Sequence, residues 1–360
     1  MSIPPYDPKT PHPIFPLFCP CPHCEYYQDL DNYITKAGTY SVKSGPEPRQ
    51  RLYCHGGEHR FSETAYSPLF GRHGSFREYV QTAKLSTYGL STDQIADVLE
   101  HDARTILQWQ TALGQKSREF HLSLCCLIGL TLTFLQMDEI WSYLRRKTRQ
   151  LWVFISFEVR SKFWLNFELG SRTGHTAKRL VNNLVYLMPW GFEQFLLVTT
   201  DKLAAYEKAI AQCFRHVRYA YLQIVKQRRK RRLVTVKQRL VKGKESDFPP
   251  KTRNTSYLER FNLTLRQSVS YLQRKTLGYC KSQVNFQWML WMNLFNYNYC
   301  QFHRSLRQDL TGEATKFQRR YRHLTPGMKM GLTSTRLDWR DLIVAPIPEN
   351  AHEFITSTVL

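Results

Sequence analysis

The sequence predicts a multidomain α/β protein in which a cysteine-rich segment and a helical segment precede a mixed sheet flanked by helices. Two observations support this fold class. Short runs of β-forming apolar residues alternate with helical stretches between residues 130 and 305, which is typical of a sheet with helices packed on it. The 360 residues are 42% hydrophobic and include eight Trp, 20 Tyr and 21 Phe, enough apolar surface for a core.

The chain is strongly basic, with 51 Lys and Arg against 29 Asp and Glu and a formal net charge of +22. This balance predicts an acidic partner, either nucleic acid or an anionic membrane surface. The longest apolar stretch, residues 124–137, is shorter than the about 20 residues of a bilayer span. We therefore predict a nucleic-acid partner and no membrane.

The amino-terminal sequence MSIPPYDPKTPHP lacks the charged and then apolar pattern of a secretory signal. A cytoplasmic location follows as an expectation, and the nine cysteines are expected to stay reduced there rather than to form disulfides. Cysteines in a reducing compartment are free to bind metal.

A zinc-binding domain is predicted for residues 1–65. Cys21 and Cys24 form a C-x2-C pair, and Cys54 follows thirty residues later. Zinc prefers four tetrahedral sulfur or imidazole ligands, and these cysteines supply three. The segment is rich in Pro and contains Gly, a composition that suits folding around a metal better than a packed core. The alternative is that these are ordinary reduced cysteines in a loop.

The fourth zinc ligand is less clear from spacing, because no second cysteine pair follows Cys54. His59 is the favoured candidate, since His55 directly follows Cys54 and adjacent residues rarely reach the same metal. Cys19 is a further thiolate that could take part. We expect one structural zinc ion per chain.

A helix-turn-helix domain is predicted for residues 66–118, which read as three short helices. Ser91 and Gln94 have the spacing of a capping box and mark the start of one helix. Asp102 is expected to cap the next helix. A plain helical hairpin is the alternative to a DNA-reading motif.

The second helix of this motif is predicted from about 103 to 113, ending at Gly114. In a helix-turn-helix the second helix enters the major groove, where outward Arg and Gln side chains read base edges. The outward, DNA-contacting residues are predicted to be Arg104, Gln108 and Thr111.

A catalytic domain is predicted for residues 130–305, with the strand and helix order of a ribonuclease-H-like fold. The first three strands are expected to form an antiparallel meander. The elements in chain order are a strand leading to Asp138, strands near 151–159 and 162–169, a helix near 175–188, a strand leading to Asp201, a helix near 202–212 and a strand near 216–225.

Three carboxylates are the candidate catalytic residues. Asp138 and Asp201 each follow an apolar run, so both are expected to emerge from neighbouring buried strands. Glu259 lies in a helical pattern that leaves Glu259 and Arg266 together on the polar face. The apolar positions of that pattern are Tyr257, Phe261, Leu265 and Leu272.

This combination suits phosphodiester chemistry, in which an attacking and a departing oxygen must be stabilised around an already anionic phosphorus. Two hard cations roughly 3.5–4 Å apart do this, and they prefer oxygen ligands. Asp138, Asp201 and Glu259 are therefore predicted to hold two Mg²⁺ or Mn²⁺ ions. Taken singly, an Asp after a strand is more often a turn former or a helix cap.

Three segments resemble the carboxylate motifs of one family, the DDE transposases of bacterial insertion sequences with InsA and InsB reading frames. The segments are LQMDEIWSYL with KTRQLW after it, TTDKLAAYE, and YLERFNLTLRQ. The amino-terminal cysteine and helical segments resemble the InsA part, so the similarity spans roughly residues 20–305. The resemblance implies a ribonuclease-H fold, divalent-metal phosphoryl transfer, and mobilisation of an element through its terminal inverted repeats.

The resemblance also assigns a role to Arg266, which matches the basic position seven residues after the last carboxylate and would contact a DNA phosphate. Two departures stand out. The second cysteine pair of the zinc segment is missing, and a basic insertion lengthens the gap between the second and third carboxylates. The carboxy-terminal segment 306–360 resembles related transposases only loosely.

The basic insertion, residues 226–253, carries twelve Lys or Arg against two acids. A solvated, disordered linker is one interpretation. β-forming residues such as Val234 and Val236 interrupt the charge, so we predict instead a twisted β-ribbon that lies along DNA. Its predicted phosphate contacts are Arg228, Arg229, Lys230, Arg231 and Arg232.

The sequence as a whole predicts a DNA transposase that binds terminal inverted repeats, nicks DNA with activated water, and then joins the freed 3′-hydroxyl to a target. We expect a homodimer or higher oligomer on double-stranded DNA, in a prokaryotic cytoplasm at the nucleoid. The alternatives are a catalytically inactive DNA-binding regulator derived from a transposase, and a structure-selective nuclease of the same fold.

Overall fold

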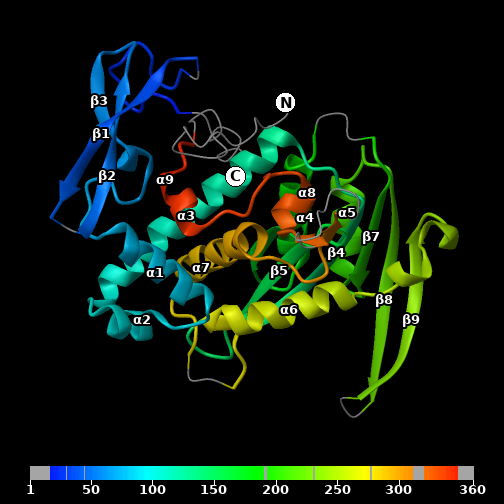
Figure 1. The fold of residues 1–360 in the computed structure, drawn as a ribbon. Coiled ribbons are helices and arrows are strands. Elements are labelled where there is room, and N and C mark those ends of the chain that lie inside the picture. Colours follow the sequence, from blue (N-terminus) through cyan, green and yellow to red (C-terminus); the bar gives the residue numbers. More distant parts are fainter. Residues whose placement is uncertain are drawn as a thin grey trace. The chain divides into compact units, whose positions relative to one another are not determined.

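The computed structural model describes residues 17–29, 31–43, 45–189, 193–229, 232–275, 278–310 and 320–347, and its chain forms two compact units (Figure 1). Unit 1 comprises Met1–Leu127, Gln287–Gln301 and Gly331–Leu360, and unit 2 comprises Ile128–Phe286 and Phe302–Met330. The predicted zinc and helical segments therefore share one unit, and the predicted catalytic region and carboxy-terminal segment each contribute to both.

Unit 1 begins with a small antiparallel sheet in the order β1-β2-β3. Its strands are β1 (Ile34–Val42), β2 (Gly45–Cys54) and β3 (His59–Ser62), followed by the short helix η1 (Glu63–Tyr66). Cys54 and His59 are register partners at the end of the β2–β3 hairpin. The hairpin thus brings together two residues that were predicted to bind the same metal.

Three helices follow in unit 1: α1 (Phe76–Thr87), α2 (Thr92–Leu99) and α3 (Ala103–Ile128). The predicted capping box at the start of α2 is confirmed, because the Ser91 side chain accepts from Gln94 N and the Gln94 side chain accepts from Ser91 N. Asp102 caps α3 as predicted, and its Oδ1 accepts from Arg104 N at 2.7 Å.

The predicted end of α3 at Gly114 is wrong, because the helix continues to Ile128. A Cβ at Gly114 would lie 2.5 Å from the Cβ of Trp288, in helix α7 (Gln283–Phe295). The glycine is therefore needed for the close approach of two helices and does not stop one. Helix α7 continues into the π-helix η5 (Asn296–Cys300), and α9 (Trp339–Val344) is a further helix of this unit.

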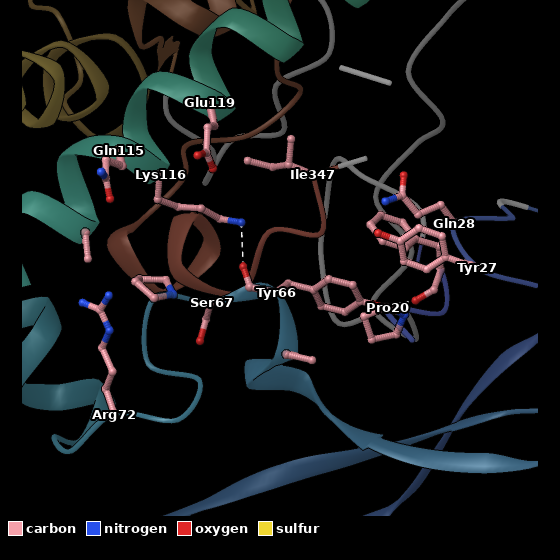
Figure 2. A pocket seen from close by; sticks show the side chains of 14 residues that line it. Pro20, Tyr27, Gln28, Tyr66, Ser67, Arg72, Gln115, Lys116, Glu119 and Ile347 are labelled. Atoms are coloured by element: carbon pink, nitrogen blue, oxygen red, sulfur yellow. Dashed lines mark hydrogen bonds between the residues drawn. The ribbon is translucent and has the colours of Figure 1, made fainter. Parts of the chain in front are cut away.

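A cavity of about 380 Å³ lies in unit 1 beside Lys116 (Figure 2). The buried Lys116 ammonium donates to the carbonyl oxygens of Tyr66 at 2.6 Å and Ala345 at 2.7 Å. Burial lowers the pKa of Lys116 to about 8. Lys116 ties three chain segments together, and none of the predicted site residues lines this cavity.

Unit 2 is built on a six-stranded mixed sheet in the order β6-β5-β4-β7-β8-β9. Strands β4, β5 and β6 form the predicted antiparallel meander, β7 and β8 add in parallel, and β9 returns antiparallel to β8. The strands are β4 (Phe134–Tyr143), β5 (Gln150–Glu158), β6 (Phe163–Gly170), β7 (Leu196–Asp201), β8 (Tyr219–Arg229) and β9 (Arg232–Lys242).

Helices lie on both faces of this sheet, because side chains on opposite faces of β4 contact different helices. Gln136 of β4 accepts from Leu258 N in helix α6 (Ser256–Ser268), whereas Glu139 accepts from the Tyr206 hydroxyl of α5 (Ala204–Cys213). The other elements of unit 2 are α4 (Gly174–Tyr186), η2 (Glu245–Asp247), η3 (Pro250–Thr252), η4 (Ser270–Leu272), β10 (Arg307–Asp309), β11 (Tyr321–His323) and α8 (Pro326–Met330).

The predicted β-ribbon is confirmed for residues 226–229 and 232–242 of the basic segment, and the rest of the segment contains η2 and η3. Pairing of β8 with β7 ends at Ile224, but its pairing with β9 continues to Arg229. The two strands therefore extend beyond the rest of the sheet (Figure 1). Lys230 and Arg231 lie outside the described residues. Across the described ranges, no helix is both long and apolar enough to span a membrane.

Candidate active site and metal centres

The three predicted carboxylates line one cavity of unit 2, with a volume of about 500 Å³. Strand β4 supplies Asp138, β7 ends at Asp201, and α6 supplies Glu259. Lys226 and Asn262 also line this cavity. Residues separated by more than a hundred positions are thus brought together by the order of the strands and the placement of α6.

The parallel register of β4 and β7 sets the two aspartates side by side. Met137 is the partner of Thr200, so Asp138 and Asp201 occupy the next position along each strand. The prediction of neighbouring buried strands is confirmed, although Asp138 lies within β4 and not after its end. Ligand oxygens of Asp138, Glu139 and Asp201 lie within 4.8 Å of one another, and we call these three residues the carboxylate group.

Glu139 was missed by the sequence prediction. Its carboxylate is only 2% exposed, and Oε1 accepts from Arg172 Nε at 2.8 Å while Oε2 accepts from the Tyr206 hydroxyl at 3.3 Å. Arg172 Nη2 also lies 3.7 Å from Asp201 Oδ2. The available signal was that Glu139 directly follows Asp138 in the sequence. Successive side chains of a strand point to opposite faces, yet the ligand oxygens of these two residues lie within 4.8 Å of each other.

Asp138 is held in an environment that disfavours its charge. Burial raises the pKa of Asp138 to about 7, and the negative charges of Glu139 and Asp201 add to the effect. Asn262 Nδ2 donates to Asp138 Oδ2 at 2.8 Å. The buried Asn262 Oδ1 has no hydrogen-bond partner among the described residues, so this amide has one acceptor to offer a ligand or its water.

Glu259 lies outside the carboxylate group and is 49% exposed. It forms an ion pair with Lys226, and its Oε1 also accepts from the Thr255 hydroxyl at 2.7 Å. In its present position Glu259 therefore faces a lysine ammonium.

The apolar face of α6 differs by one position from the predicted one. Leu258, Phe261 and Leu265 are buried, whereas Tyr257 is 39% exposed and packs against the Lys162 ammonium. The Phe261 ring stacks on Phe157 of β5 at 4.9 Å, which fixes α6 on the sheet. Leu272, although buried as expected, belongs to η4 and not to α6.

Arg266 lines the same cavity on the last turn of α6. Its Nη1 donates to the Leu272 carbonyl at 3.2 Å, and burial together with the positive charge of Arg274 lowers its pKa. Arg266 is therefore held at the cavity wall. Its contact with a DNA phosphate stays a prediction.

The carboxylate group fits a divalent cation. Carboxylate oxygens are hard ligands, and a cation between Asp138 and Asp201 would offset the burial and the repulsion that raise the pKa of Asp138. The unpaired Asn262 Oδ1 adds a neutral acceptor beside them.

A second group of metal-binding residues lies in unit 1 and consists of Cys19, Cys24, Cys54 and His59, whose ligand atoms are within 4.8 Å of one another. We call it the Cys/His group. Of the predicted ligands, Cys24, Cys54 and His59 belong to this group and Cys21 does not, and the fourth member is Cys19, the further thiolate that the sequence offered. The Cys21 carbonyl accepts from Cys24 N at 3.0 Å in a tight turn, and metal binding by the Cys21 thiol stays a prediction.

Neutral hydrogen bonds orient this group. His59 Nδ1 lies 3.0 Å from the Gly57 carbonyl, which leaves Nε2 facing Cys19 Sγ at 3.3 Å. Cys54 Sγ accepts from Gly57 N at 3.2 Å and from Asn32 Nδ2 at 3.1 Å. Burial raises the pKa of Cys54, but these hydrogen bonds lower it on balance.

The donor set of the Cys/His group, three sulfurs and one imidazole, fits zinc. A Cβ at Gly57 would lie 2.4 Å from Cys24 Sγ, so only glycine fits beside this cluster. The alternative ligand His55 lies elsewhere and contacts Thr35 Oγ1 at 2.9 Å.

The predicted base-reading residues lie on α3. Arg104 and Gln108 are exposed, as expected for the outward face of this helix, whereas Thr111 is half-buried. The Thr111 hydroxyl donates to the Leu107 carbonyl at 2.9 Å. Their contact with DNA stays a prediction.

Residues 131–246 match the family model of the IS1 transposase. This part of the chain is similar to IS1 transposases. The match covers β4 to β9 with Asp138 and Asp201, and most of the predicted insertion, but it ends before Glu259.

Curated IS1 relatives agree with the family model. The protein InsB of insertion element IS1 4 from Escherichia coli (strain K12) is 28% identical over 147 residues, 41% of this chain and 65% of that protein. InsB of an IS1 element from Shigella sonnei is 28% identical over 147 residues, 82% of its length. The chain thus spans less than two thirds of the Escherichia coli relative.

Proposed function

We propose that the protein is a DNA transposase that cuts and joins DNA with divalent cations held by Asp138, Asp201 and Glu259. The observation that carries this proposal is the convergence of these three carboxylates on one cavity, within and beside a segment that is similar to IS1 transposases. The strand order β6-β5-β4-β7-β8 is the order expected of a ribonuclease-H-like domain, and it supports the same fold.

The residues that line the cavity have different proposed roles. Asp138 and Asp201 supply oxygens that are close enough to share a cation, and Asn262 fixes the orientation of Asp138. Glu259 approaches from α6, where it can ligate a second cation. When bound, two divalent ions would make water and a DNA 3′-hydroxyl effective nucleophiles and stabilise the departing oxygen. Arg266 is positioned to bind a DNA phosphate at the cavity wall.

Three further parts of the chain support DNA as the substrate. In unit 1, the Cys/His group would hold one structural zinc, and α2 and α3 would act as a helix-turn-helix that presents Arg104 and Gln108 to the major groove. In unit 2, the basic ribbon would lie along the phosphate backbone. We propose that the active form is a homodimer or higher oligomer on double-stranded DNA.

The test uses purified full-length protein, Mg²⁺ or Mn²⁺, and the DNA that flanks its gene. Cleavage at the element ends followed by joining to a target is expected, and both should be lost with Asp201→Asn. Nicking without joining would instead identify a structure-selective nuclease. Specific binding without any nicking would identify a catalytically inactive regulator.

A further inference from the structure

The Lys226 ammonium lies against the third carboxylate, Glu259. The ammonium contacts Glu259 Oε1 and donates to the Thr255 hydroxyl at 2.8 Å, and that hydroxyl donates to the same Glu259 oxygen at 2.7 Å. Lys226 is thus held by Glu259 of α6 and by Thr255, the residue that precedes this helix. A divalent cation bound at the same carboxylate oxygen would be repelled by the Lys226 ammonium, because like charges repel.

Lys226 also lies at the base of the basic ribbon. It is two residues beyond Ile224, the last residue of β8 that pairs with β7, and its ladder partner on β9 is Val236. Ile224 and Lys226 both line the cavity of the carboxylates. The same side chain therefore belongs to the proposed DNA-binding surface and to the proposed active site.

We propose that Lys226 couples DNA binding to cation binding at Glu259. A backbone phosphate that enters the cavity takes the Lys226 ammonium from Glu259, and the freed carboxylate then binds the second divalent cation. This inference rests on the proposed metal-dependent function of the same site. It makes Lys226 a positioning residue that acts through Glu259 and the DNA strand.

The ion pair between Lys226 and Glu259 is exposed enough for Lys226 to exchange Glu259 for a DNA phosphate. The side chains are 26% and 49% exposed, and ion pairs of this kind stabilise a protein little. Thr255 is buried, so its hydroxyl keeps Glu259 oriented when the lysine leaves. Asp138 and Asp201, by contrast, lie within 4.8 Å of each other and can take a cation without DNA. Only the site at Glu259 should depend on DNA.

Such coupling is reciprocal. If DNA strengthens cation binding by some factor, the cation must strengthen DNA binding by the same factor, and couplings of this kind are roughly fivefold to 150-fold. A structural ion pair between Lys226 and Glu259 would show no such linkage.

The test is a Mn²⁺ titration followed by electron paramagnetic resonance, with and without a short random-sequence DNA duplex. In the wild-type protein, DNA should strengthen binding of the weaker Mn²⁺ ion at least fivefold. In Lys226→Met that ion should bind well without DNA, and DNA should add little. Glu259→Gln gives the baseline for Mn²⁺ held by the duplex itself. Lys226→Arg, which keeps the charge, should retain the coupling.

Lys237→Met is the matched control, because Lys237 lies on the same ribbon but pairs with Val225, one position away from the Lys226 face. It should lower the slope of log affinity against log salt by about 0.9, as Lys226→Met does, while leaving the Mn²⁺ linkage intact. The same DNA dependence of Mn²⁺ binding in Lys226→Met and wild type would overturn the inference. Absence of Mn²⁺ binding in the wild type, or binding unaffected by Asp201→Asn, would instead overturn the proposed function.

Discussion

The Cys/His group and the carboxylate group are both suited to metal ions, but the chain builds and surrounds them in different ways. The Cys/His group comes from residues 19 to 59, on a loop and the β2–β3 hairpin. The carboxylate group and Glu259 come from two strands and a helix spread over residues 138 to 259. One site is local in the sequence, and the other exists only in the folded sheet.

Their surroundings differ in charge. Neutral N–H donors from Asn32 and Gly57 contact Cys54, and such donors can stay in place when the thiolate binds a metal. Cationic side chains contact the acids instead, Arg172 at Glu139 and Lys226 at Glu259. A cation at the acids must compete with these side chains, so we expect a permanent structural ion in unit 1 and exchangeable ions in unit 2.

The largest effect is expected at the Cys/His group. Cys54→Ser should release zinc and unfold the amino-terminal segment, because structural zinc contributes about 10–16 kcal/mol in small zinc-dependent folds. Cys21→Ser is the matched control and should keep the metal, since Cys21 lies outside the group. Metal analysis and circular dichroism distinguish the variants. Zinc loss in Cys21→Ser and retention in Cys19→Ser would restore the sequence-based ligand set.

A large but purely functional effect is expected at the aspartates. Asp138→Asn and Asp201→Asn should each lower the rate of DNA cleavage about a thousandfold or more, since a catalytic metal contributes several kcal/mol to transition-state stabilisation. Zinc content and the binding of DNA ends should be unchanged. Near-normal cleavage and joining in either variant would remove that aspartate from the proposed site.

Intermediate effects are expected from the amides that orient each site. Asn32→Ala should weaken metal binding at the Cys/His group, and Asn262→Ala should weaken Mn²⁺ binding at the carboxylate group, each by about 10- to 100-fold. Each variant is the control for the other, because neither amide contacts the second site. Competition with a chelator measures both affinities, and equal loss at both sites in one variant would indicate general unfolding.

The smallest effect is a pH dependence at Asp138, whose pKa is raised to about 7. The metal must displace this proton, so Mn²⁺ affinity should rise about tenfold per pH unit up to about pH 7 and then level off. Without metal, the raised pKa of Asp138 contributes to the stability of the fold, and this contribution is fully present below the ordinary pKa of 3.8. It is lost as the pH rises to about 7. Mn²⁺ titrations at several pH values should show the tenfold rise per pH unit in the wild type. The same rise in Asp138→Asn would assign the effect to another group.

Much of the carboxylate site could be predicted from the sequence, despite its long-range nature. Apolar runs identify β4 and β7, and parallel pairing of neighbouring strands then sets Asp138 beside Asp201. Helical periodicity places Glu259 on α6, and the Ser91 capping box marks the start of α2. These features follow from local repeat patterns, which a chain displays whatever its tertiary contacts are.

Other features were decided by the tertiary structure alone. The fold places the Cys19 thiol, and not that of Cys21, beside Cys24, Cys54 and His59, and α3 continues past Gly114, where the glycine allows the close approach of Trp288. The pairing of Glu139 with Arg172 and of Glu259 with Lys226 likewise depends on which side chains the fold brings within reach. A sequence shows the hydrophobic period of each helix and strand. Which residue lies at a metal site, and which charged side chain contacts it, depend on packing between elements. Turns and close contacts there select among residues of similar chemistry.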